Sequence, residues 1–230
     1  MEPPTFDQAP ETLTADAPEA LPRGPHGLPR DVVVRSQRTR MLRALIEVVA
    51  EKGYAATTVA DVIGRAGVSR TTFYEQFRDK EDCFLVAFGK GGQAQYLKVI
   101  EAVRSASDPL EQLRRNLRAY LSELTAFPAS ARAFLLEVPA AGPRALEVRD
   151  AIVNGYAALL AHLYDGFRER RQGLPELPGE VFRAAVAAVD DLVLCWVRAG
   201  RLEHLAELEP IAAYVELAMF GLPDAFEVLR

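Results

Sequence analysis

The sequence has few of the residues that build metal, cofactor and disulfide sites. Its 230 residues include two cysteines, three histidines and one tryptophan. Cys83 and Cys195 lie within apolar helical patterns, so we expect two buried, reduced thiols rather than a disulfide. The three histidines are scattered without the spacing of metal ligands. We therefore expect neither a metal ion nor a cofactor.

Long apolar segments are also missing. No apolar run approaches the roughly 20 residues that a membrane-spanning helix needs. The first residues lack the basic, apolar and small-residue order of a signal peptide. The sequence therefore predicts a cytoplasmic protein with no membrane partner.

The motifs of common enzymes are not found either. There is no nucleophile elbow or zinc motif, and residues 89–92 (GKGG) lack the spacing and the preceding strand of a phosphate-binding loop. The enzymatic alternative would assemble an acid–base site from Glu137, His162, Asp190 and Asp191. No activating motif accompanies those residues, so we expect that the chain is not an enzyme.

Helical periodicity dominates what is present. Residues 1–30 hold seven of the 15 prolines and no apolar periodicity, which predicts a disordered tail. From residue 31 almost to the end, apolar residues recur at helical spacing without a strand signal. Breaks in the pattern separate about six helices after residue 80 and fall at 107–109, 127–128, 139–143, 173–179 and 200–210. The pattern predicts an all-α fold.

Positive charge is concentrated between residues 35 and 80. This segment has nine basic and five acidic residues, whereas the rest of the chain is acidic and the whole chain has a net charge of -5. Leu42, Leu45, Ile46 and Val49 form one apolar stripe on its first helix. At the expected start of that helix, Arg38 and its neighbouring arginines crowd the positive end of the helix dipole, which favours an anion such as a phosphate.

Two short helices follow with the pattern of a helix-turn-helix. Thr58 and Asp61 are spaced for a capping box, Gly67 for the tight turn and Ser69 for the cap of the next helix. On that last helix the apolar spacing turns Phe73 and Phe77 inward. Arg70, Thr71 and Tyr74 are left on its open side, where a recognition helix meets DNA, and Thr72 lies at the edge.

The segment GYAATTVADVIGRAGVSRTTFYEQFRDKEDCF resembles the amino-terminal signature of the tetracycline-repressor-like (TetR) family. The resemblance covers roughly residues 38–88 and implies an all-helical dimeric regulator with a DNA-binding head and an effector-binding body. It implies phosphate contacts for Thr58, Tyr74 and Lys80, and recognition-helix contacts for Arg70, Thr71 and Thr72. Two positions depart from the family pattern: Thr71, where a small residue is common, and Gln76, where histidine or tyrosine is usual.

The carboxy-terminal part resembles the family only in architecture. We predict a tail at 1–30, a helix-turn-helix DNA-binding domain at 31–80 and a ligand-binding and dimerisation domain at 81–230. Between the middle helices we expect a small apolar effector, with candidate lining residues Tyr120, Phe127, Phe134, Leu135, Tyr156 and Trp196. Each of these is more often ordinary core.

The last two helices, about 180–199 and 210–225, have more apolar surface than one face can bury. This favours a homodimer in which both helices of each copy pack together. The candidate interface residues are Val186, Val189, Val193, Val197, Ile211, Val215 and Met219.

The sequence thus predicts a ligand-responsive regulator, most simply a repressor that binds a palindromic DNA operator as a homodimer and is released by a small apolar effector. Besides an enzyme, the alternative is a helical ligand-binding or oligomerising protein that does not regulate DNA.

Overall fold

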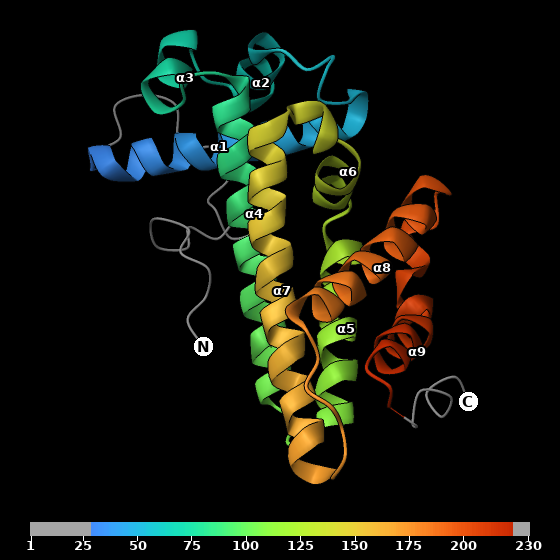
Figure 1. The fold of residues 1–230 in the computed structure, drawn as a ribbon. Coiled ribbons are helices and arrows are strands. Elements are labelled where there is room, and N and C mark those ends of the chain that lie inside the picture. The colour runs from blue at the N-terminus through green and yellow to red at the C-terminus, as the bar shows by residue number, and fades with distance from the viewer. Residues whose placement is uncertain (1–28, 223–230) are drawn as a thin grey trace. The chain divides into compact units, whose positions relative to one another are not determined.

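The structure of the chain is a computed structural model, and it describes residues 29–222. These residues form α-helices joined by short turns and two 3-10 helices, without a strand (Figure 1). In chain order the elements are α1 Arg30–Lys52, α2 Val59–Ala66, α3 Arg70–Gln76, α4 Lys80–Arg104, α5 Pro109–Ala126, α6 Pro128–Leu136, η1 Pro139–Ala141, α7 Pro143–Arg170, α8 Gly179–Arg198, η2 Leu202–Leu208 and α9 Glu209–Met219. The predicted all-α fold is confirmed.

The expected breaks agree with the helix ends. Asp108 caps α5 by accepting a hydrogen bond from the backbone N–H of Glu111, and Pro109 occupies the first turn, where its missing N–H costs nothing. Six α-helices follow residue 79 within the described part of the chain, as the pattern predicted. Residues 1–28 of the predicted tail and 223–225 of the last predicted helix lie outside the described residues.

The described residues divide into two compact units. The first, here called the head unit, comprises residues 29–94 and 129–148. The second, the bundle unit, comprises residues 95–128 and 149–222. The predicted domain boundary at residue 80 does not coincide with this division, because part of α4 and most of α6 pack with the first three helices.

Aromatic packing explains why the head unit extends beyond residue 80. Phe134 of α6 lies with its ring centroid 5.8 Å from that of Phe84 and 5.0 Å from that of Phe88, both on α4. Phe84 also meets the ring of Tyr54 edge-on at 5.1 Å. Gly91 leaves room for Phe134, because a Cβ there would lie 3.0 Å from the Phe134 ring. Contacts between α6 and α4 therefore complete the core of this unit.

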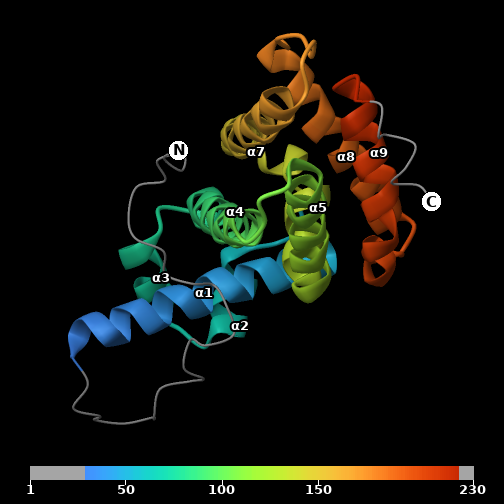
Figure 2. The same ribbon diagram turned by 90° about the horizontal axis from the view of Figure 1, so that it is seen from below.

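The bundle unit has its own apolar core. Its largest fully buried side chains include Tyr164 of α7, Leu113 and Leu117 of α5, and Phe220 after α9. In both views α8 and α9 lie side by side, and they are in contact (Figures 1 and 2). Charged groups also hold this unit together, since Arg114 forms a two-pronged ion pair with Glu209, with N···O distances of 2.6 and 3.0 Å.

Candidate nucleic-acid interface and effector region

The second helix begins with the predicted capping box. The Asp61 backbone N–H donates to Thr58 Oγ1 at 3.2 Å, and the Thr58 backbone N–H donates to Asp61 Oδ2 at 2.8 Å. The Thr58 hydroxyl also donates to Asp61 Oδ2, at 2.5 Å, and Lys52 Nζ lies 2.6 Å from the same oxygen. These interactions lower the pKa of the Asp61 carboxyl. Thr58 is exposed, and its hydroxyl already has a partner in this structure.

The turn and the third helix follow the predicted pattern. Gly67 has φ of 62° and ψ of 43°, the left-handed conformation that favours glycine. Ser69 caps α3 by accepting from the Thr72 N–H at 3.0 Å, and the two hydroxyls lie 2.8 Å apart. Phe73 and Phe77 are 0% and 2% exposed, which confirms them as core.

The open face of α3 presents polar and basic groups. Arg70, Thr71 and Tyr74 are all exposed, and Tyr74 retains 47% of its accessible surface. The Arg70 guanidinium lies 5.7 Å from the centre of the Tyr74 ring, within range of a cation–π contact. Glu75 is exposed as well, so the face also carries one acid that the sequence argument did not consider. Thr72 is half-buried, and its hydroxyl contacts the Ser69 cap.

Arg38 connects α1 to the end of α3. Its Nη1 donates to the Gln76 backbone oxygen at 3.0 Å, and its guanidinium lies 4.5 Å above the Phe77 ring. Gln76 in turn donates from its side-chain amide to the Val34 backbone oxygen at 3.3 Å. The unusual glutamine at position 76 thus has a structural role, and Arg38 is partly engaged within the protein. Its contact with DNA stays a prediction.

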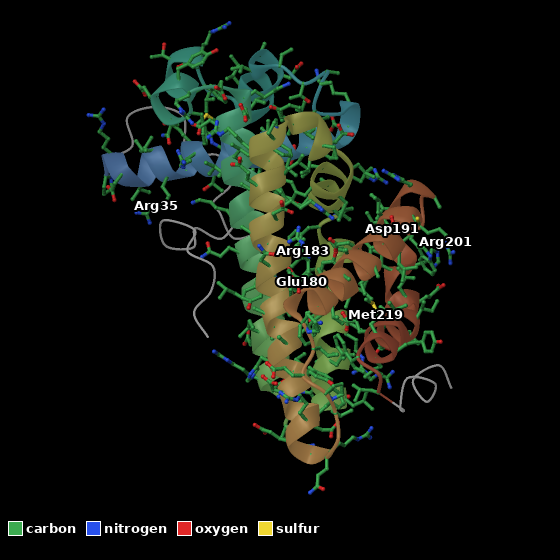
Figure 3. All side chains as sticks on the ribbon, in the orientation of Figure 1. Arg35, Glu180, Arg183, Asp191, Arg201 and Met219 are labelled. Atoms are coloured by element: carbon green, nitrogen blue, oxygen red, sulfur yellow. The ribbon has the colours of Figure 1, made fainter. Side chains whose placement is uncertain are left out.

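The dipole argument for the arginines of α1 was wrong. The helix begins at Arg30, with Asp31 in its first turn, rather than near Arg35. Arg38 therefore lies two turns inside the helix, where the terminal dipole has little effect. Arg35, labelled in Figure 3, lies 3.8 Å from Asp31. The proline at position 29 made the true start hard to recognise, because Pro29 is the N-cap without a side-chain cap.

Lys80 is bound by the loop between α1 and α2. Its Nζ donates to the backbone oxygens of Tyr54 at 2.7 Å and Thr57 at 2.9 Å, and lies 4.0 Å from the centre of the Tyr54 ring. Burial lowers the pKa of this ammonium group. Two carbonyl oxygens thus offset this cation at the start of α4. The implied phosphate contact of Lys80 is not tested by this geometry.

The same loop is also held from the segment after α6. Glu137 Oε2 accepts a hydrogen bond of 2.8 Å from the Tyr54 backbone N–H. This carboxylate also lies 3.3 Å from the position that a Cβ on Gly53 would take. Gly53 ends α1 with φ of 82°, as a C-terminal glycine does. Glu137, predicted as part of an enzymatic alternative, is therefore a positioning residue of the head unit.

The comparisons with known proteins agree with this geometry. A model of the bacterial regulatory proteins of the tetR family matches residues 41–87. Over residues 41–87 the chain is similar to the DNA-binding segment of TetR-family regulators. The fatty acid metabolism regulator protein of Bacillus subtilis is 25% identical over 192 residues, which cover 82% of this chain and 96% of that protein.

Two further relatives match over shorter regions. The uncharacterized regulator YerO of B. subtilis is 28% identical, and the transcriptional activator FasR of Mycolicibacterium smegmatis is 30% identical. The matched regions span 39% and 40% of this chain but only 32% and 41% of those proteins. All three relatives are named as regulators, which supports the prediction that the chain is not an enzyme.

Solved structures show the same fold. The fatty acid degradation regulator FadR from Bacillus halodurans superposes with a TM-score of 0.71 and 24% identity, covering 79% of this chain and 94% of that one. FadR from B. subtilis in complex with stearoyl-CoA gives 0.70 and 20% identity, covering 78% and 97%. These structures share the all-α fold of this chain.

The six effector candidates are divided between the two units. Phe134 and Leu135 belong to the head unit, where Phe134 packs against Phe84 and Phe88. In the bundle unit, Lys98 Nζ lies 5.3 Å from the centre of the Phe127 ring. Trp196 is half-exposed, with the Arg201 guanidinium 3.5 Å from its ring centre. The apolar character of these residues in the sequence could not show that they lie in different parts of the structure.

Tyr120 and Tyr156 of that set pack against each other in the bundle unit. Their ring centroids lie 5.8 Å apart, and the Tyr120 hydroxyl donates to Asp190 Oδ1 at 2.8 Å. Asp190, named above within the enzymatic alternative, thus points inward and pairs with Tyr120. Arg149 Nη2 donates to the other Asp190 oxygen at 3.4 Å. The interruption of an apolar helix by acids was the only sequence signal for this cluster.

The predicted dimer residues on α8 are wrong for a surface contact. Val186, Val189, Val193 and Val197 are between 0% and 8% exposed within the chain itself, so they belong to the core. The exposed stripe of α8 instead carries small and polar side chains, namely Glu180, Ala184, Ala187, Asp191, Cys195 and Arg198. Sequence reasoning missed it because β-branched residues outweigh alanines in an apolar pattern.

The residues predicted on α9 are more accessible. Ile211 is 42% exposed, and Val215 and Met219 are half-buried. Figure 3 labels Glu180 and Asp191 on α8 and Met219 on α9. We call the exposed stripe of α8 together with Ile211, Val215 and Met219 the α8–α9 surface. Cys195, expected to be buried, lies on this surface, whereas Cys83 is buried as expected.

The described residues contain neither a helix suited to span a membrane nor a cluster of metal ligands. None of their helices has the length and apolar character to cross a membrane. No group of three or more potential metal ligands occurs among them.

Proposed function

We propose that this chain is a TetR-family DNA-binding transcriptional regulator whose α3 reads bases in the major groove. The observation that carries the proposal is the exposed face of α3, with Arg70, Thr71 and Tyr74 outward and Phe73 and Phe77 buried beneath it. Arginine can pair with guanine through two hydrogen bonds, and threonine can contact the methyl group of thymine. Tyr74 supplies a hydroxyl that suits a phosphate oxygen.

The regulator acts as a homodimer on a palindromic operator. The α8–α9 surface supports this step, because small side chains on α8 allow helices of two copies to approach closely and apolar groups on α9 become buried. Two recognition helices related by a two-fold axis would read half-sites about 34 Å apart. Occupancy of such a site excludes the transcription machinery, so we propose repression as the outcome.

The effector carries a fatty acyl chain. Support comes from the relative named as a fatty acid metabolism regulator and from the neighbour in complex with stearoyl-CoA. Ligand binding releases DNA only if the ligand has different affinities for the two conformational states.

Selection of fragments from the organism's own DNA, followed by binding titrations, tests the regulator. We expect Arg70→Ala to relax the preference at one base pair, and Tyr74→Phe to weaken binding to all sequences by a similar factor. If Arg70→Ala weakens selected and random DNA equally, it has no base-reading role. If no fragment binds even at low salt, the helical ligand-binding alternative replaces the proposal.

Acyl compounds added to the complex with a selected fragment test the effector. We expect acyl-CoA to release the DNA at concentrations at which coenzyme A alone does not. Reporter transcription with and without the regulator then separates repression from activation.

A further inference from the structure

Three tyrosines from three helices meet inside the bundle unit. The ring of Tyr156 on α7 lies edge-on to the ring of Tyr96 on α4, at 5.3 Å, and to the ring of Tyr120 on α5, at 5.8 Å. Asp190 on α8 adds a carboxylate that accepts the hydrogen bond from Tyr120. We call these four residues the tyrosine cluster. It places polar atoms among apolar core residues of the four helices.

The hydroxyl of Tyr156 differs in its hydrogen bonding from the tyrosine hydroxyls of Tyr120 and Tyr164. Tyr156 is 8% exposed, and its hydroxyl oxygen is buried without a hydrogen-bond partner among the described residues. By contrast, the Tyr120 hydroxyl donates to Asp190 and the Tyr164 hydroxyl donates to the Pro175 backbone oxygen at 2.8 Å. Buried polar groups are nearly always paired, because an unmade hydrogen bond costs free energy. A bound molecule can therefore gain from pairing with Tyr156.

The charges around this hydroxyl determine which molecule suits it. Burial, reinforced by the nearby Asp190 and Glu123 carboxylates, raises the pKa of the Tyr156 phenol. The phenol stays protonated and can donate. Asp190 has partners on both oxygens, Tyr120 and Arg149, so it does not compete for that proton. A second carboxylate at the hydroxyl would have to share the Arg149 cation with Asp190, whereas an uncharged carbonyl needs no cation.

We propose that Tyr156 donates a hydrogen bond to an uncharged carbonyl oxygen of the effector, as in an acyl ester or thioester. This inference rests on the proposed function and narrows the effector to acyl compounds whose carboxyl carbon is esterified. Tyr120 and Asp190 are positioning residues, because their hydrogen bond fixes the ring against which Tyr156 packs.

Calorimetric titration of the full chain with three probes of one chain length tests this. Methyl decanoate and decanoyl-CoA present an uncharged carbonyl, and decanoate presents a carboxylate. We expect Tyr156→Phe to weaken binding of both esters by about tenfold and to leave decanoate unchanged. The matched control Tyr164→Phe removes a hydroxyl that is paired elsewhere and should leave all three affinities unchanged.

Thermal unfolding without a probe gives a second readout. Because Tyr156 has no internal partner to lose, Tyr156→Phe should unfold at the wild-type temperature or slightly above it, whereas Tyr164→Phe should unfold below it. Any of four results would overturn the inference: an equal loss for all probes, no loss for the esters, no ester binding at all, or tighter binding of decanoate.

Binding of the wild-type chain to selected DNA, measured without a probe, tests the regulator separately. A chain that binds DNA and both esters, but shows no selective loss in Tyr156→Phe, contradicts only the role of Tyr156. A chain that binds DNA but no ester also contradicts the acyl effector. A chain that passes the ester test but binds no DNA contradicts only the regulator.

Discussion

Replacement of Lys80 by methionine separates a structural role from a phosphate contact. The ammonium group donates to two backbone oxygens, of Tyr54 and Thr57, at 2.7 and 2.9 Å. Hydrogen bonds to charged groups contribute about 1.5 to 3 kcal/mol each. The lower end of this range gives about 3 kcal/mol for two bonds, and because the lysine is only half-buried we expect Lys80→Met to cost about 2 to 3 kcal/mol of unfolding free energy. The methionine keeps the apolar stem against the Tyr54 ring.

The assays are urea unfolding and DNA titration over a range of salt concentrations. For a domain of this size the loss corresponds to a decrease in melting temperature of roughly 5 to 10 °C. Since the ammonium is held by carbonyls, we expect the slope of log affinity against log salt to stay unchanged. Tyr74→Phe, at an exposed side chain, is the control and should not alter stability. The reasoning is refuted if Lys80→Met is as stable as the wild type and its slope of log affinity against log salt is lower in magnitude by about one. Lys80 would then be a phosphate contact.

Three further predictions follow from buried groups and from the α8–α9 surface. Burial raises the pKa of the Glu216 carboxyl to about 8, so between about pH 5 and 8 the folded chain holds one proton more than the unfolded chain. Unfolding free energy should therefore fall by up to about 1.4 kcal/mol per pH unit as pH rises. Glu216→Gln should remove this decline in urea unfolding at several pH values, and parallel pH profiles would contradict the assignment. Gly91→Ala should destabilise by about 1 to 2 kcal/mol, because the clash with Phe134 exceeds the gain in helix propensity. The control is Gly64→Ala, where a Cβ would meet open space, and this variant should stabilise the protein by roughly 0.5 to 1 kcal/mol. If denaturant melts show that both variants stabilise or that both destabilise the protein, the packing argument is disproved. In sedimentation experiments, Ala187→Glu on the exposed stripe of α8 should convert a dimer into a folded monomer. An unchanged molecular mass would exclude this stripe from the dimer interface.

Local physics made the helix-turn-helix predictable. Capping by Thr58 and Ser69 and the turn at Gly67 depend on a few neighbouring residues, so their spacing is sufficient to locate them. The inward direction of Phe73 and Phe77 follows from helical periodicity. The start of α1 was misplaced because Pro29 has no capping side chain to announce it.

Long-range packing made the rest unpredictable. The Asp190 cluster joins α5, α7 and α8, and no spacing within one helix shows which acid of a pair points inward. Valines and alanines both count as apolar when the periodicity of α8 is considered. Packing against the neighbouring helices determines which of the two stripes becomes core.

The sequence by itself determined that the chain is all-α and that residues 31–80 form a basic helix-turn-helix, since caps, turns and periodicity act over a few residues. The tertiary structure decided which basic groups are bound within the protein. Lys80 and Arg38 are held by backbone oxygens, whereas Arg70 remains exposed on α3. The tertiary structure also left the Tyr156 hydroxyl without a partner. Side chains from distant helices pair only when folding brings them together. No single sequence position therefore shows whether its side chain will find a partner.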